Sequence, residues 1–389
     1  AGPERPIDLM LVLDRSGSMG TSGGTDAIGN LKITSLKNAV NAFLGLQNTF
    51  SANDRIGITS FASRGCGDAG GQDTSNTTPN NCLPDKVMDF TTSSYISQLQ
   101  ATVSGLCGGG TACTGGTNTM EALRTARVPL AATYNNPSRA LTRKALLLVT
   151  DGQPTFLRRE ASGTDCRRNP RDNVSILPAG PNGCVLGVAT YPNAQSRYQV
   201  LRGALNLPGN ANLTAYPNNA SNQAWYLDFI RCTRSMTGCI TNGAMYEANE
   251  VRNCGFNNPS CGGGGQHDVV FFAIGIGQPL TNSPQGSFDN NAKCLLARMA
   301  NAEQIVHANT GVTETLSGVC ATQIPTIDGD THADLNQGWP ACASGSAPCI
   351  DPNQEKGKVY IIDPTGNVTT QLSLVFQEIA SILKLRLVL

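Results

Sequence analysis

Several stretches of the chain are apolar at nearly every position, without the polar alternation of a half-exposed strand. Six of the seven residues from Ile7 to Leu13 are apolar, and similar runs cover 144–149 and 268–277. Strands of this kind are buried on both faces, as they are inside a parallel sheet covered by helices. We expect three further strands, at 55–62, 86–90 and 358–362.

Segments with apolar residues at helical spacing lie between these runs. An amphipathic helix packs its apolar side on a sheet. We expect helices at 31–47, 96–106, 119–134, 292–300 and 371–383, and mostly helical material in 220–252. Because strands and helices alternate, the sequence predicts an α/β fold with a doubly wound, mostly parallel six-stranded sheet flanked by helices.

Two long stretches interrupt the alternation. Residues 154–218 and 320–351 are rich in Gly, Pro, Asn and other polar residues, and they show weak periodicity. Both are too long for ordinary connections. We therefore expect one domain over 1–389 with two insertions, the first ending between 218 and 265. This first insertion either builds a recognition surface at the sheet edge or is a surface loop remote from any site.

The charge balance argues against a polyelectrolyte partner. The chain has 28 basic and 28 acidic residues, and charged residues make up only 14% of it. Nucleic acid is therefore not expected as a partner. No signal peptide or transmembrane run is present, and the first strand begins almost at Ala1. This start indicates upstream processing or truncation, so that membrane association would depend on an anchor absent from this chain.

Fourteen cysteines lie mostly in Gly-, Pro- and Asn-rich loops, which indicates disulfides formed in an oxidising compartment. Zinc is the rival interpretation, but no CxxC spacing occurs and histidines are scarce. We expect neighbouring cysteines to pair in order, with the group Cys254, Cys261, Cys294 and Cys320 the one most open to cross-pairing. The cysteines are Cys66, Cys82, Cys107, Cys113, Cys166, Cys184, Cys232, Cys239, Cys254, Cys261, Cys294, Cys320, Cys342 and Cys349.

Side-chain oxygens gather directly after the first predicted strand. Asp14, Ser16 and Ser18 offer one carboxylate and two hydroxyls at alternate positions, and Gly17 and Gly20 permit a tight turn beneath them. Mg²⁺ prefers oxygen ligands in near-octahedral geometry and keeps some of its waters. Hydroxyls with one or two carboxylates suit such an ion. The alternative is that these residues form only a turn.

Two later segments add to this pattern. Thr117 follows Gly115-Gly116 ahead of a predicted helix, and Asp151 ends the second strongly apolar strand. With the DxSxS element at 14–18, these residues resemble the von Willebrand factor A domain and its metal-ion-dependent adhesion site. In the alternative interpretation Asp151 caps a helix.

The resemblance implies which of these residues would contact a metal ion directly and which would act through water. Ser16, Ser18 and Thr117 would contact a bound Mg²⁺, Mn²⁺ or Ca²⁺ directly, and Asp14 and Asp151 would act largely through water. An acidic side chain of a protein partner would take the open position. With hydroxyls in direct contact, the ion keeps much of its charge, and this favours binding over turnover.

A finer resemblance comes from Val12–Met19, from 376–380 and from 385–387, which look most like bacterial TadG-type proteins of the tight-adherence pilus system. It implies an extracellular or cell-surface protein associated with pili, with pilus subunits as possible partners. The insertions and the number of cysteines exceed those of a plain TadG-like domain. The alternative function is a structural pilus or surface assembly component of the TadG or PilY1 kind, in which the metal stabilises the loops.

Two further features give weaker signals for chemistry. Asp328, Asp330 and Asp334 alternate as acids that could bind Ca²⁺, but no Glu follows at EF-hand spacing, so a solvated loop is the alternative. The three histidines are isolated from one another.

Enzymatic activity is not expected. A chelatase-like enzyme of this fold would need a reducing compartment, and no base or nucleophile accompanies the predicted metal ligands.

Overall fold

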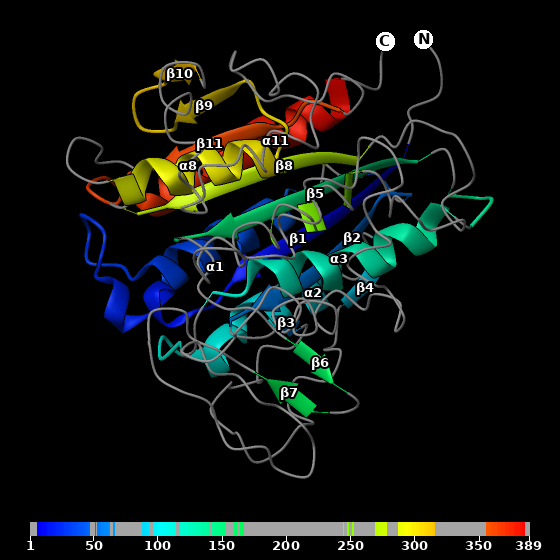
Figure 1. Ribbon diagram of the computed structural model, residues 1–389, viewed down its shortest axis with the longest axis horizontal. Helices are drawn as coiled ribbons and strands as arrows, with labels where there is room; N and C mark the ends of the chain where they lie inside the picture. Colours follow the sequence, from blue (N-terminus) through cyan, green and yellow to red (C-terminus); the bar gives the residue numbers. More distant parts are fainter. Residues whose placement is uncertain are drawn as a thin grey trace, which may run out of the picture.

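The computed structural model describes residues 6–46, 51, 53–62, 65–66, 88–92, 96–113, 117–134, 136–139, 142–152, 159–161, 164–166, 244, 247–248, 251–252, 269–277, 287–315 and 355–385. Within these ranges it shows one large sheet with helices on both faces (Figure 1). Two shorter strands, β6 (Arg159–Ala161) and β7 (Thr164–Cys166), form a separate antiparallel hairpin.

The described part of the large sheet has nine strands in the order β10-β9-β11-β8-β5-β1-β2-β3, and β4 also pairs with β2. Its six inner strands, from β9 to β2, are parallel. The strands are β1 (Ile7–Asp14), β2 (Arg55–Phe61), β3 (Gly65–Cys66), β4 (Met88–Thr92), β5 (Arg143–Thr150), β8 (Val269–Ile276), β9 (Gln304–His307), β10 (Thr313–Thr315) and β11 (Lys358–Ile362). The predicted doubly wound, mostly parallel fold is confirmed.

Helices cover the two faces of the sheet (Figure 1). They are α1 (Lys32–Leu44), α2 (Ile96–Ser104), α3 (Thr119–Tyr134), α8 (Ser287–Met299) and α11 (Val368–Leu385). Successive side chains of a strand point to opposite faces. Accordingly, Leu9, Leu11 and Leu13 of β1 join the apolar cluster of α1, α2 and α11, whereas Met10 and Val12 join that of α3 and α8.

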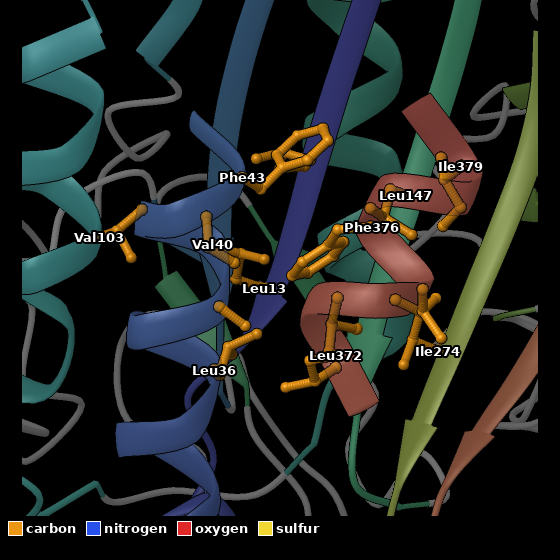
Figure 2. Close-up of a cluster of buried hydrophobic side chains, with 14 of the residues drawn as sticks. Leu13, Leu36, Val40, Phe43, Val103, Leu147, Ile274, Leu372, Phe376 and Ile379 are labelled. Atoms are coloured by element: carbon orange, nitrogen blue, oxygen red, sulfur yellow. The ribbon is translucent and has the colours of Figure 1, made fainter. Parts of the chain in front are cut away.

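The contact between α1 and α11 forms the centre of one face. Figure 2 shows Phe43 of α1 and Phe376 of α11 lying over Leu13 and Leu147 of the central strands, and the two ring centroids are 5.2 Å apart. Burying a side chain of this size contributes about 1.5–3 kcal/mol. The first and last helices therefore hold the same face of the sheet.

The predicted elements differ from the structure mainly at the sheet edges. The strand expected at 86–90 is β4, which pairs antiparallel with β2, and the sixth parallel strand is the unpredicted β9. β9 has only four residues, and Ile305 is the one that is fully buried. So short a strand gives no apolar run in the sequence. The helix expected at 292–300 begins earlier, at Ser287.

Other predictions fall partly or wholly outside the described residues. The insertion at 154–218 is described only in β6 and β7, and the insertion at 320–351, with Asp328, Asp330 and Asp334, lies outside the described residues. Of the predicted cystines, Cys107–Cys113 is confirmed, and no free cysteine occurs in the described part of the chain. None of the described helices has the length and apolar character needed to span a membrane.

Candidate metal centre

The two predicted aspartates lie on neighbouring parallel strands. Asp14 is the last residue of β1, and Asp151 directly follows β5. Leu13 pairs with Val149 in the register of these strands, so both carboxylates reach the same edge of the sheet. The arrowheads of β1 and β5 point to this edge in Figure 1. Ligands of open α/β sheets bind at this carboxyl end of the strands.

Asp14 is fully buried and its carboxylate accepts two hydrogen bonds. The Ser16 amide donates to Oδ1 at 2.7 Å, and the Thr150 hydroxyl donates to Oδ2 at 2.6 Å. Burial, together with the nearby Asp151 carboxylate, raises the pKa of Asp14 from its ordinary 3.8 to about 7, against the opposing effect of these hydrogen bonds. An additional positive charge would therefore stabilise the ionised form at this position.

The two serines are also brought together. Ser16 Oγ and Ser18 Oγ lie 3.2 Å apart, and the Ser18 hydroxyl donates to Asp151 Oδ1 at 2.8 Å. Ser16 precedes a short turn of 3₁₀ helix, Gly17–Met19, and Ser18 lies within it. Ser18 is exposed, whereas Ser16 and Asp151 are buried. The cluster is therefore open to solvent on the side of Ser18.

Close backbone packing fixes the loop that carries these serines. A Cβ atom at Gly23 would lie 1.5 Å from the carbonyl oxygen of Ser18, and one at Gly20 would lie 2.5 Å from that of Thr111. Neither position can hold a side chain without moving the backbone. These glycines allow the loop to fold back on itself and to contact the segment 107–113.

Thr117 reaches the same edge through β2. The Arg15 amide donates to Phe61 O and the Asn118 amide donates to Ala62 O, each at 2.8 Å. Two consecutive carbonyls at the end of β2 therefore hold the residues next to Ser16 and next to Thr117. Thr117 is buried. The disulfide Cys107–Cys113 closes the loop ahead of it, and Cys107 Sγ lies 3.9 Å from Arg15 O.

A lysine side chain that the sequence did not predict completes the centre. Lys32, the first residue of α1, is buried and places Nζ 2.8 Å from Asp151 Oδ2. The Asp151 carboxylate thus accepts from Ser18 on one oxygen and from Lys32 on the other. A lysine near the start of an amphipathic helix carries no distinctive sequence signal. Thr150 also has no distinctive signal, because it is simply the last residue of an apolar strand.

The donor set fits a divalent cation. The Ser18 hydroxyl directs its hydrogen to a carboxylate, and its oxygen lone pairs remain for an ion. Hydrogen bonds within the centre link Asp14, Ser16, Ser18 and Asp151, from the Ser16 amide on Asp14, through the 3.2 Å hydroxyl pair, to the Ser18 hydroxyl on Asp151. Among the described residues, no group of three or more His, Cys, Asp or Glu side chains forms an alternative metal cluster.

Comparisons with known proteins give one family model and several solved structures to which this chain is similar. Residues 8–180 match the family model of the von Willebrand factor type A domain. A search of curated proteins gives no match. The structure is similar to the pilus adhesin SpaC from Lactobacillus rhamnosus GG, with 15% identity and a TM-score of 0.45, over 98% of this chain and 31% of that one.

Two further solved structures are similar. For the PilB minor pilin from Streptococcus sanguinis, the identity is 10% and the TM-score 0.43, over 100% of this chain and 63% of that one. For the vWF domain of the type V pili tip protein Mfa5 from Porphyromonas gingivalis, the values are 13% and 0.40, over 98% and 97%. The chain thus spans less than two thirds of SpaC and of PilB.

The parallel sheet, with hydroxyls and carboxylates at the carboxyl ends of its central strands, defines an α/β domain with a candidate metal centre. The family match over 8–180 begins within β1 and extends past Asp151, so it covers every residue of the centre. Residues 8–180 of this chain, the stretch that carries the centre, therefore match the von Willebrand factor type A family.

Proposed function

We propose that this protein is a non-catalytic, extracytoplasmic binding domain that holds a divalent cation and engages a carboxylate of a protein partner. Ser16, Ser18 and Thr117 contact the ion, and Asp14 and Asp151 support it through water and hydrogen bonds. Mg²⁺ is the expected ion, with Mn²⁺ or Ca²⁺ as substitutes, because the donors are all oxygens.

The 2.8 Å hydrogen bond from Ser18 to Asp151 carries this proposal. The hydroxyl keeps its proton and directs it toward the carboxylate, so that the serine offers the ion a neutral oxygen. An ion held by neutral oxygens keeps more of its charge than one held directly by carboxylates. Such an ion attracts an external carboxylate into its coordination sphere.

The exposure pattern supports binding from one direction. Asp14, Ser16, Thr117 and Asp151 are buried, and Ser18 alone among the five is exposed. A partner would therefore approach over Ser18.

The proposed location is the cell surface, in association with pili. The cystine at Cys107–Cys113 is in keeping with an oxidising compartment. The pilus association rests on the resemblance of Val12–Met19 and of 376–387 to TadG-type proteins. Pilus subunits are the proposed class of partner.

A pull-down from surface extracts tests this function. We expect a partner to be retained in about millimolar Mg²⁺ and to be released by EDTA. Thr117→Val should abolish retention, because it removes the hydroxyl that would contact the ion and keeps the shape of the side chain. The matched control is Thr21→Val, the same change at an exposed loop position, which should retain the partner.

Two outcomes would contradict metal-dependent adhesion. Partner retention that is unaffected by EDTA and by Thr117→Val would exclude the ion from recognition. If chelation instead lowers the melting temperature or blocks assembly, with no discrete partner lost, the centre serves to stabilise the loops of a structural surface component.

A further inference from the structure

Lys32 occupies a position that is costly for a lysine. Its side chain is 9% exposed, and an ammonium removed from water to that extent must be paired. It is also the first residue of α1, and the amino end of a helix favours negative charge. The 2.8 Å ion pair with Asp151 Oδ2 offsets both the loss of water around the ammonium and its unfavourable place at the helix start.

The surrounding backbone holds Lys32 in place. Asp26 Oδ1 accepts the amides of Ile28 and Asn30 at 3.1 and 2.8 Å, and Asp26 Oδ2 accepts the Ser35 hydroxyl of α1 at 3.2 Å. The loop at Gly23 also lies close, since a Cβ there would be 3.2 Å from Lys32 Nζ. The ammonium is therefore part of the centre's fixed geometry.

We propose that Lys32 is a tethered counter-cation that lowers the affinity of the centre for its divalent ion and raises the affinity of the loaded centre for a carboxylate. This inference rests on the proposed function. It adds a residue that sets the charge of the site, outside the five residues that would hold or support the ion.

A charge count shows why the two effects have opposite signs. With Asp14 and Asp151 ionised, a divalent ion makes the centre neutral, and Lys32 adds one positive charge. The ammonium repels the incoming ion and shares the Asp151 carboxylate that would support it. Once the ion is bound, the extra positive charge attracts an incoming carboxylate.

Opposite signs separate this role from a structural one. A lysine that only braced the loop would, on removal, weaken ion and carboxylate binding together. Removal of a counter-cation should tighten binding of the divalent ion and weaken binding of the carboxylate. The two measurements therefore have to be made on the same variant.

The test uses Mn²⁺ as the ion and acetate as the carboxylate probe. Calorimetric titration gives the Mn²⁺ affinity, and water-proton relaxation of the Mn²⁺-loaded protein follows displacement of bound water by acetate. Lys32→Gln keeps a hydrogen-bond donor and loses the charge. We expect it to bind Mn²⁺ about tenfold or more tightly and to need several-fold more acetate.

Two controls accompany it. Lys32→Arg keeps the charge and should stay within a few-fold of the wild type in both titrations. Lys356→Gln removes a surface ammonium that pairs with Glu303, and it should change neither. If Lys32→Gln does not fold, as judged by circular dichroism, Lys32→Met takes its place and preserves the apolar stem.

The outcomes distinguish the two levels of inference. Equal or weaker Mn²⁺ binding by Lys32→Gln, with normal binding by the wild type, overturns the counter-cation role and leaves the metal centre standing. Absence of Mn²⁺ binding by the wild type, or equal binding by Asp14→Ala, overturns the proposed function and this inference with it.

Discussion

The Thr150 hydroxyl donates a 2.6 Å hydrogen bond to Asp14 Oδ2, and the two residues belong to adjacent parallel strands of the sheet centre. The bond stabilises the ionised carboxylate, which burial and Asp151 disfavour so strongly that the pKa of Asp14 is raised to about 7. Ionisation of Asp14 is thus balanced near neutral pH in the protein without a bound ion.

Divalent-ion affinity should therefore depend on pH. A proton on Asp14 competes with the cation, so we expect the apparent Mg²⁺ or Mn²⁺ affinity to rise as the pH increases from 6 to 8, most steeply near 7. Calorimetric titration at several pH values measures this. A flat profile across that range would contradict the involvement of Asp14.

The stability of the ion-free protein should change in the opposite direction. The folded state keeps Asp14 protonated up to about pH 7, whereas the unfolded chain releases this proton near 3.8. The folded state thus binds more protons in between, and its free energy of unfolding falls as the pH rises through this window. Urea denaturation in EDTA at pH 5 and pH 8 measures the trend, and Asp14→Asn should reduce it.

Removal of the Thr150 hydroxyl should shift the pH profile. Thr150→Val removes a hydrogen bond that lowers the pKa of Asp14, so the rise in ion affinity should move to higher pH. At pH 7 we expect a severalfold loss of affinity that is largely recovered at pH 8.5. A loss that is equal at both pH values would indicate a steric effect instead.

Glycine substitutions at the centre should differ sharply. Gly23→Ala would place a methyl group 1.5 Å from Ser18 O, so it must displace the serine loop, and we expect loss of ion binding. Gly152→Ala is the matched control, because a Cβ there meets nothing within 4 Å although it adjoins Asp151. It should bind the ion normally. Both are compared by Mn²⁺ titration and by thermal melting.

The cystine beside the serine loop should contribute to stability and to affinity. Replacing both Cys107 and Cys113 by Ser releases a loop that contacts Gly20 and Arg15. For so short a loop we expect a loss of about 2 kcal/mol in the free energy of unfolding. Ion affinity should fall as well, because the segment leading to Thr117 is freed. Unchanged affinity would show that this loop does not position Thr117.

Packing between the first and last helices should matter for the fold alone. Phe376→Ala removes a buried ring from the contact with Phe43 and should cost about 3–5 kcal/mol. Leu374→Ala, on the exposed side of the same helix, should stay within about 0.5 kcal/mol. Denaturation curves measure both, and the folded Phe376→Ala protein should keep its Mn²⁺ affinity.

The central strands and the main helices could be predicted from the sequence because their signals are strong. β1, β5 and β8 are apolar on both faces, and α3 begins and ends where predicted, at Thr119 and Tyr134. β9 and β10 could not be predicted in this way, since strands of four and three residues at the sheet edge have few buried positions.

The candidate centre was predictable only in part. Asp14, Ser16, Ser18 and Asp151 form a spaced motif, and the structure joins them. Lys32 and Thr150 act through contacts that only the packing of α1 and β5 on β1 creates. The sequence contains no pattern that would single out one lysine or one threonine for such a contact.

The place of β1 within the sheet has a consequence for biosynthesis. β1 is made before its partner β5, which lies more than a hundred residues further along, as the pairing of Ile7 with Arg143 shows. Until β5 emerges, one side of an apolar strand has open backbone groups and can associate with other chains. A chaperone that shields nascent chains should therefore improve the yield of this protein.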